Sequence, residues 1–305
     1  MIAASTATAF WGPWESLVKS LQEFHEILEK LFDRWVVPGD RVFAWRGVAD
    51  ATWPLHSSLY RRLAATMTTL PDEAALAAAE KRILDEAHRW GLHQSGQGRL
   101  GALEQLAMLQ HFGAPTRLVD VSFNPYIALW FAVEVDDPQD GRVFAIDVTQ
   151  RLINEDDKMR EWEPMAAVPW KTDQWWNSRA LAWRPPPIER RIAAQHGAFL
   201  LGGVPISSGP DGPIQWPKST SAGAKWKIAE VRRFISVPLR MHKLDPGAGG
   251  VRPDGWPAYT FRVLGTAKSE IRMRLEKLFG FQHRTLFPDY PGFAKYATRG
   301  LFPFP

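Results

Sequence analysis

The chain has 305 residues, of which 45% are hydrophobic and 23% are charged. These values exclude a disordered chain and are ordinary for a folded protein of one large domain or two small ones. The complete lack of cysteine excludes disulfides, a cysteine nucleophile and any zinc site built on thiolates. The sequence has neither a signal-peptide pattern nor an apolar run near the ~20 residues that span a bilayer, so we expect a cytoplasmic protein with no membrane partner.

The net charge of +4 is unevenly distributed along the chain. Residues 1–178 hold 17 Lys and Arg against 25 Asp and Glu, a net charge of −8. Residues 179–305 hold 20 against 8, a net charge of +12. Such asymmetry is typical of a basic surface for nucleic acid or another phosphate-bearing partner. A merely solvated surface is the alternative interpretation.

Hydrophobic spacing predicts the helices and strands in chain order. Helices are predicted over the ranges 14–35, 72–90, 102–112 and 267–279. Another helix is predicted to begin at Asn124 and Pro125, because Asn caps a helix well and Pro is tolerated in the first turn. Strands are predicted over the ranges 42–45, 142–148, 191–201, 231–239 and 258–264.

Helices interleaved with short strands and long loops favour an α+β fold. The G-x-G-x-x-G turn of a doubly wound nucleotide-binding sheet is absent. We expect an N-terminal helix within residues 1–37 and one domain over residues 38–300. Stretches rich in Trp, Pro and Gly predict insertions in that domain near 161–187 and 202–258.

The densest polar cluster is the stretch QHFGAPTRLVD, which contains Gln110, His111, Thr116, Arg117 and Asp120. Polar groups between apolar helices must be paired or used. In a structural interpretation, Arg117 and Asp120 form a buried ion pair while His111 caps a helix end. In a functional one, Gln110 and His111 line a cleft, and Arg117 holds a phosphate or supports the loop.

A second cluster begins with Arg46 and Gly47 at the end of the strand predicted over 42–45. An arginine there can grip a diphosphate, and a glycine lets a ligand or a backbone approach closely. Ser57, Ser58 and Arg61 follow shortly after, and the two serines are better placed to cap a helix than to act as nucleophiles. The spacings of a nucleophile elbow, a P-loop and an H-E-x-x-H metal helix are absent, so we predict no metal site.

Two later stretches also carry polar and aromatic side chains. Gln195, Gly197 and Phe199 share one side of the strand predicted over 191–201. A stretch with four tryptophans among basic residues can stack bases beside phosphate-binding cations, or it can simply pack against the domain. Those tryptophans are Trp170, Trp175, Trp176 and Trp183.

These clusters, taken in order, resemble the FRG domain family. The residues that carry the resemblance are Trp45-Arg46-Gly47, Leu55, Ser58, Leu59, Arg61, Glu80, QHFGAPTRLVD, Asn124-Pro125, ALWFA, Arg191-Ile192, Gln195, Gly197, Phe199, Phe287-Pro288-Asp289, Gly292 and Ala294. Trp45, Val121 and Tyr290 depart from the family pattern by apolar exchanges that should only repack the core. The resemblance implies a bacterial or phage protein of the cytoplasm, but no common activity.

The order of the clusters is also similar to the Arg, Ser, Glu pattern of ADP-ribosyltransferases. In those enzymes a strand-end Arg or His holds NAD, and a late Glu steadies the oxocarbenium-like ribose as nicotinamide leaves. The late position here is Gln195, which carries no negative charge. This resemblance implies that Glu80 or Glu104 supplies the carboxylate, that Gln195 orients the acceptor, or that the chain does not catalyse.

Three functions therefore stay open. The first is an ADP-ribosyltransferase-like or NAD-cleaving enzyme in a toxin or phage-defence setting, with NAD as substrate and no tightly bound cofactor. Its catalytic residues would be His111, Gln195 and Glu80, and its ligand-binding residues Arg46, Gly47, Ser58, Arg61, Gln110, Thr116, Arg117 and Asp120. The second is a nucleic-acid-binding protein whose basic half follows the phosphate backbone, or a nuclease that uses His111 and Arg117. The third is a non-catalytic interaction module with a protein partner.

Overall fold

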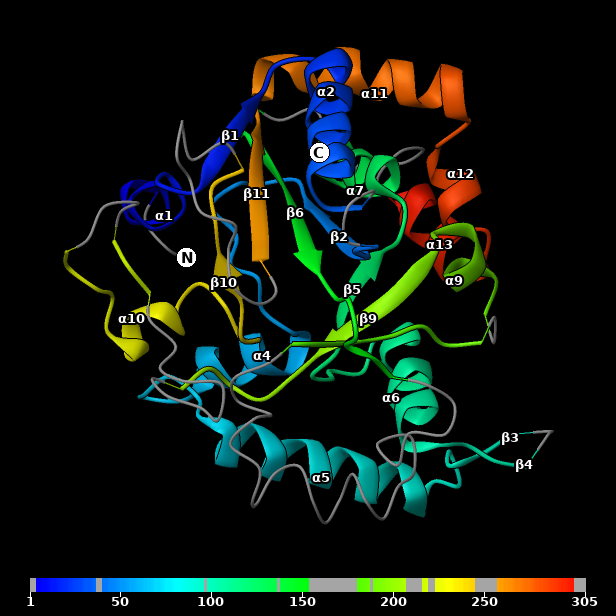
Figure 1. Cartoon of the computed structure of the whole chain (residues 1–305). Helices are drawn as coiled ribbons and strands as arrows, with labels where there is room; N and C mark the ends of the chain where they lie inside the picture. Colours follow the sequence, from blue (N-terminus) through cyan, green and yellow to red (C-terminus); the bar gives the residue numbers. More distant parts are fainter. Residues whose placement is uncertain are drawn as a thin grey trace.

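The computed structural model (Figure 1) describes residues 4–36, 40–95, 98–135, 138–153, 180–186, 189–206, 216–218, 223–244 and 257–298. Its helices are α1 Ala4–Trp11, α2 Leu21–Leu31, the π-helix η1 Phe32–Val36, α4 Ser58–Thr66, α5 Glu73–Arg89, α6 Ala102–His111, α7 Pro125–Val133, α9 Arg190–Ala194, α10 Ile228–Val231, α11 Gly265–Phe279, α12 His283–Leu286 and α13 Tyr290–Tyr296. Its strands are β1 Glu15–Val18, β2 Phe43–Val48, β3 Gln94–Ser95, β4 Gly98–Arg99, β5 Val119–Ser122, β6 Gly141–Asp147, β7 Leu152–Ile153, β8 Leu181–Trp183, β9 Gly197–Leu201, β10 Arg240–Met241 and β11 Pro257–Val263.

A mixed β-sheet runs through the described part of the chain in the order β1-β11-β6-β2-β5-β9-β8-β7, with β10 also paired to β11. The central pairs are antiparallel, whereas β1 and β10 run parallel to β11, and β7 runs parallel to β8. Strands β3 and β4 form a separate hairpin. The prediction of an α+β fold is confirmed.

The two faces of the sheet are buried against different elements. On one face, α2, α7 and α11 pack on β2, β6 and β11 through a core that includes Phe24, Trp45, Leu129, Phe261 and Ile271. Figure 1 shows these three helices together at the top of the view. On the other face, α1 and α10 with the segment after α10 enclose a second core, which includes Trp11, Phe144, Phe234 and Leu200.

A third core lies under α6, farther along the sheet. Its residues include Leu103, Leu106, Trp183 and Phe199, with Leu84 contributed by α5. Helix α6, together with Leu84 of α5, therefore packs against β9, away from the three helices at the other end of the sheet (Figure 1).

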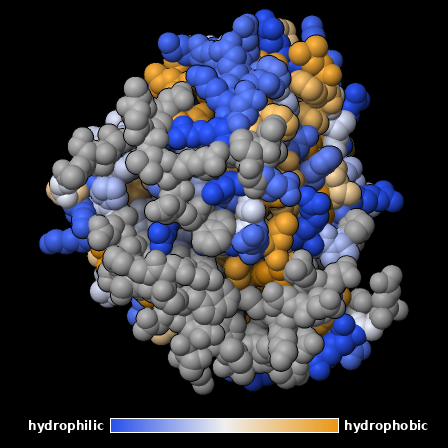
Figure 2. All heavy atoms as spheres, viewed as in Figure 1, coloured by the Kyte–Doolittle hydropathy of each residue, from blue (hydrophilic) through white to orange (hydrophobic). Residues whose placement is uncertain are grey.

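The surface shows how α11 is only half buried. Figure 2 shows hydrophobic residues gathered at the upper right, where Figure 1 places the C-terminal end of α11. Met273, Leu278 and Phe279 are exposed there, whereas Ile271 and Leu275 of the same helix are buried. The other side of α11 thus packs on α7 and the sheet.

Several predicted elements are confirmed. Helices α5, α6, α7 and α11 and strands β6 and β11 occupy the expected stretches. The Asn124 side chain caps α7 by accepting from the backbone N–H of Tyr126 at 2.9 Å. Ser57 caps α4 by accepting from the N–H of Tyr60, so the hydroxyl before this helix has the capping role expected for the pair Ser57-Ser58.

Three predicted elements are wrong in part. The helix expected over 14–35 begins only at Leu21, because Ser20 caps it there and the residues before it pair with β11 as strand β1. The strand expected over 191–201 begins at Gly197, after the short helix α9. The strand expected over 231–239 is replaced by the end of α10 and turns. Helix α11 is also followed by α12 and α13, which the sequence did not predict.

Helix α7 lies directly on the backbone of β2. A Cβ added to Gly47 would lie 1.7 Å from the carbonyl oxygen of Ala128. Only glycine fits between the strand and the helix at this point.

Gly47→Ala is therefore expected to cost about 3 kcal/mol or more of unfolding free energy, because the helix must move away from the sheet. Urea denaturation measures this cost. Gly223→Ala is the matched control, since a Cβ at Gly223 meets no atom of the described residues within 4 Å. Equal stability of the two variants would contradict the close contact.

The loop after β2 is tied to the segment after α10. Leu55 donates its N–H to the Phe234 carbonyl at 2.7 Å, and the buried His56 ring lies 3.0 Å from the Arg232 carbonyl through Nε2. Burial lowers the pKa of His56 to about 3, although the hydrogen bond to Arg232 opposes this shift. His56 is therefore neutral in the folded protein at neutral pH.

Unfolding exposes His56, whose pKa then returns to about 6.5. Stability should consequently fall as the pH drops from about 6.5 toward 3, by up to about 1.4 kcal/mol per pH unit from this residue. Denaturation curves at pH 7, 6, 5 and 4 for wild type and His56→Gln test this, and the variant should show the shallower loss. His25→Gln, at an exposed position, should follow wild type. A His56→Gln curve parallel to wild type would contradict the assignment.

Candidate functional site

A cavity of about 640 Å³ lies on the sheet between α7 and α6. Its floor includes Gly47 of β2, Asp120 and Ser122 of β5, and Phe199 of β9. Helix α7 contributes Phe131, and helix α6 contributes Gln110 and His111. Residues of α9 and the C-terminal helices complete the wall, among them Arg191, Gln195, Phe287 and Lys295. Segments distant in sequence therefore meet around one space.

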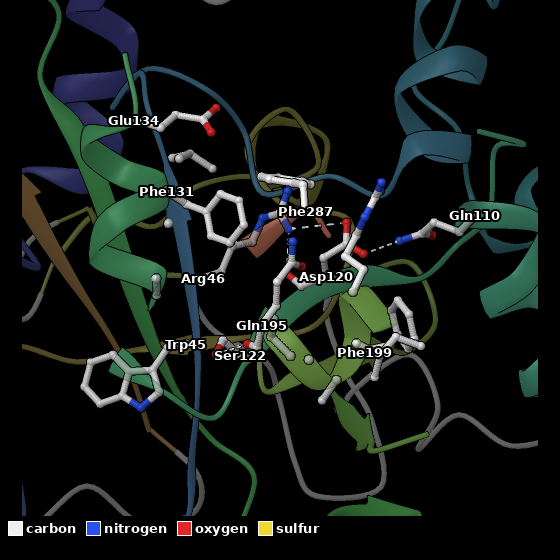
Figure 3. A pocket seen from close by; sticks show the side chains of 18 of the residues that line it. Trp45, Arg46, Gln110, Asp120, Ser122, Phe131, Glu134, Gln195, Phe199 and Phe287 are labelled. Atoms are coloured by element: carbon white, nitrogen blue, oxygen red, sulfur yellow. Dashed lines mark hydrogen bonds and ion pairs between the residues drawn. The ribbon is translucent and has the colours of Figure 1, made fainter. Parts of the chain in front are cut away.

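Arg46 and Asp120 are the central polar pair of this cavity. Strands β2 and β5 pair at Trp45 and Ser122, and next to that pair the Arg46 guanidinium donates through Nη1 to the Asp120 carbonyl at 2.5 Å. The same Nη1 lies 3.9 Å from Oδ2 of Asp120. Figure 3 shows Arg46 in the middle of the cavity, between Phe131, Phe287 and Gln195.

The environment of Arg46 suits an anion. Burial lowers the pKa of Arg46; Asp120 opposes this shift, and the charge of Arg61 adds to it. The Nε of Arg46 is buried and has no hydrogen-bond partner among the described residues. A buried donor without a partner costs free energy, which a bound acceptor would recover.

A chain of hydrogen bonds orients Asp120. The Thr116 hydroxyl donates to Oε1 of Gln110, and this fixes the amide so that Nε2 of Gln110 donates to Oδ1 of Asp120 at 2.7 Å. Thr116 is held in turn by Ser58, whose Oγ accepts from its backbone N–H at 3.0 Å. The Asp120 side chain is nevertheless 66% exposed, so its carboxylate stays accessible.

Ser58 and Thr116 were predicted to bind ligand, and neither lines the cavity. They act through Gln110 and position the carboxylate of Asp120.

Arg117 lies behind the cavity in a buried ionic cluster. Its Nε donates to both carboxylate oxygens of Glu80, at 2.8 and 2.9 Å, and its Nη1 donates to Glu73 at 3.1 Å. Burial raises the pKa of Glu80, and the charge of Arg117 opposes that shift. The expected Arg117–Asp120 ion pair is therefore wrong, because two carboxylates of α5 take the place of Asp120.

Glu80, predicted to be catalytic, and Arg117, predicted to bind ligand, do not line the cavity. Both are 1% exposed. Glu104, the other helix carboxylate considered, accepts from the Gly101 N–H at 2.8 Å at the start of α6 and is also outside the lining. A carboxylate that acts on a ligand in this cavity must therefore come from another residue. Asp120 and Glu134 line the cavity and are the candidates.

The remaining predicted residues do line the cavity. Arg61 donates to the His56 carbonyl at 3.0 Å. The His111 side chain is 8% exposed, and its Nε2 lies 3.7 Å from Glu189. Gln195 was predicted to lie in a strand, but it caps the end of α9. Its Nε2 donates to the Leu286 carbonyl at 2.9 Å.

The sequence had indicated no functional role for the aromatic and C-terminal residues that line the cavity. Arg191 donates to both oxygens of Asp289, at 2.8 and 2.6 Å, and lies 5.1 Å from the centre of the Phe287 ring. Phe287-Pro288-Asp289 carried part of the family resemblance, and this was the available signal. Phe131 lies within α7 and Glu134 caps its end, and because this helix is apolar all round, the spacing of apolar residues could not single out Phe131 or Glu134.

Comparison with protein-family models gives a match to the FRG domain over residues 41–141. The chain contains an FRG domain. The matched segment includes the whole hydrogen-bonded chain from Ser58 to Arg46 and the ionic cluster of Arg117. Comparison with curated proteins and with solved structures gave no significant match.

The FRG match ends before Arg191, Gln195 and Phe287, so the cavity combines the matched segment with later residues. The longer domain expected over 38–300 stays a prediction. Of the Trp-rich stretch, Trp170, Trp175 and Trp176 lie outside the described residues, and Trp183 is buried in β8.

The described residues contain no group of His, Asp and Glu side chains that could hold a metal ion. The same part of the chain contains no helix with the length and apolar character needed to cross a bilayer.

Glu80→Gln should cost about 3 kcal/mol or more of unfolding free energy, because it leaves the buried Arg117 without one of its two carboxylates. Urea denaturation measures the loss. Glu104→Gln, which keeps a side-chain oxygen for the α6 cap, should lose far less. A Glu80→Gln protein as stable as wild type but without activity would contradict the structural role and restore Glu80 as a catalytic residue.

Proposed function

We propose that this FRG-domain protein binds NAD in the cavity and cleaves its nicotinamide glycosidic bond, passing ADP-ribose to an acceptor. The observation that carries the proposal is the buried Nε of Arg46, which has no partner within the described part of the chain, beside the accessible carboxylate of Asp120. The cavity volume of about 640 Å³ also lies within the ~300–1,000 Å³ usual for ligand pockets.

The cationic groups suit a diphosphate. Arg46 and Arg61 both line the cavity, and burial is the main cause that lowers the pKa of each. A poorly hydrated guanidinium binds phosphate oxygens strongly, because it loses little water on binding. We assign the diphosphate to these two arginines.

The aromatic walls suit a planar base. Phe131 and Phe287 approach edge to face, with ring centres 5.8 Å apart, and both border the cavity. Their rings offer an apolar surface against which nicotinamide or adenine can pack. Figure 3 shows both rings beside Arg46.

Asp120 is the carboxylate that we assign to the reacting ribose. When the bond between C1′ and nicotinamide breaks, its electron pair leaves with nicotinamide and C1′ becomes positive. A fixed carboxylate stabilises that charge, as it does in glycoside hydrolysis. Gln110 and Arg46 hold Asp120 in place, so Asp120 takes the role that the sequence had given to Glu80.

The acceptor side is assigned to His111 and Gln195, which line the cavity with Asp120. His111 lies beside Glu189, so the imidazole can take the acceptor's proton. An NAD-consuming activity would suit a toxin or phage-defence protein, and the family resemblance implies a bacterial or phage source.

The nuclease alternative depends on His111 and Arg117. Arg117 is enclosed by protein and committed to Glu80 and Glu73, so it is not placed to contact a phosphate backbone. The non-catalytic alternative is decided by the experiment below.

NAD consumption and an NAD-dependent thermal shift test the proposal together. Asp120→Asn should still shift with NAD but lower kcat about 100-fold or more, because it keeps the shape and removes the charge. Glu134→Gln is the matched control, since it alters the other carboxylate of the cavity and should keep most activity. Arg46→Ala should lose the NAD shift. A wild-type protein that neither binds nor consumes NAD overturns the proposal.

A further inference from the structure

A second depression, of about 1,040 Å³, opens beside the cavity, and the two share His111 and Phe287. We name it the outer groove. It lies between the end of α6 and the C-terminal helices, with Phe112 on one side and residues of α12 and α13 on the other. Figure 1 shows α9, α12 and α13 gathered at the right of the molecule, beyond β9.

Aromatic rings dominate this groove and face the solvent. Phe112 is 68% exposed, Tyr290 is 91% exposed and Phe293 is 61% exposed. Rings that are this exposed bury little apolar surface within the protein. They would bury more if a flat molecule stacked on them.

The rings continue toward the cavity as a stack. The His283 ring stacks on Phe287 with centres 4.6 Å apart and an angle of 22°, and it also stacks with Tyr296 at 5.6 Å and 30°. Phe287 is also a wall of the cavity. The stack therefore runs from the surface to the proposed site of NAD cleavage.

The groove also carries exposed cations. Arg190 and Arg284 line it, and Lys295 lies next to it with Nζ 5.7 Å from the centre of the Phe287 ring. Rings interleaved with exposed cations are the pattern by which proteins bind unpaired bases and the phosphates between them.

Three acids also border the groove, and one of them is paired with an arginine. Asp289 accepts both hydrogen bonds from Arg191, whereas Glu189 lies 3.7 Å from His111 and Glu276 is the third acid. The three exposed cations Arg190, Arg284 and Lys295 thus outnumber the other two acids, and this small positive excess suits an anionic partner.

We propose that the outer groove binds single-stranded nucleic acid and presents an unpaired base to the cavity as the acceptor of ADP-ribose. The acceptor half of this proposal rests on the proposed function. As the bond from C1′ to nicotinamide breaks, nicotinamide leaves with the electron pair. A base nitrogen forms the new bond to C1′ with its lone pair, and its proton passes to His111.

Binding is tested by fluorescence anisotropy with a labelled single-stranded oligonucleotide of about 12 nucleotides. Tyr290→Ala and Phe112→Ala should each weaken binding about 10-fold, because each removes one stacking surface. The affinity of wild type should fall as salt rises from about 50 to about 200 mM. Both residues are exposed, so the melting temperatures of the variants should match that of wild type.

Trp90→Ala is the matched control, since Trp90 is 74% exposed at the end of α5 and does not line the groove. It should bind as wild type does. The proposal is overturned if wild type does not bind the oligonucleotide, if the groove variants bind as tightly as wild type, or if an unstructured peptide binds in its place.

The acceptor step is separated from NAD cleavage by two readouts on the same samples. NAD consumption without nucleic acid, with water as acceptor, tests the proposed function alone. The mass of the oligonucleotide after incubation with NAD tests the groove, and a gain of one ADP-ribose that Tyr290→Ala reduces supports it. NAD consumption with an unchanged, bound oligonucleotide overturns the acceptor role alone. Groove-dependent binding without NAD consumption overturns the proposed function and the acceptor role that rests on it, and it supports the binding half of the proposal.

Discussion

The buried charge of Arg117 is the constraint on which the site depends. A guanidinium enclosed by protein is tolerated only with carboxylates beside it, and α5 supplies both of them, Glu80 and Glu73. Glu73 also accepts from the N–H of Val204, so the same helix holds the chain after β9. Thr116, next to Arg117 in sequence, is thereby fixed where it orients Gln110. The geometry of the cavity follows from an ionic cluster that does not touch it.

Much of the fold could be predicted because its signals are local. The spacing of apolar residues in α5 and α11, and the Asn-Pro start of α7, depend only on neighbouring residues. Strand β1 could not be found in this way, since Leu17 continues the helical spacing of α2 and the pairing with β11 joins opposite ends of the sequence. Helix α9 is too short for periodicity to separate it from a strand.

Several residues of the site could be predicted from the sequence, but the ion pairs that they form could not. The stretch QHFGAPTRLVD correctly brought Gln110, His111 and Asp120 to the cavity. The sequence could not tell that Arg117 bonds to α5 and Asp120 to Arg46, because both partners are distant along the chain. Backbone alternation also could not place Gln195, which follows a helical turn.

The contact between α7 and the sheet has a consequence for how the protein can change in evolution. At Gly47 and again at Gly141, carbonyls of the helix, from Ala128 and Ala132, rest against the strands where a side chain would stand. The height of the helix above the sheet is set by backbone atoms, which substitutions do not alter. Apolar exchanges in the core around this helix can therefore accumulate while Phe131 keeps its place at the cavity. Substitutions in the core therefore need not change the cavity, because the two glycines let backbone contacts alone fix the position of α7 on the sheet.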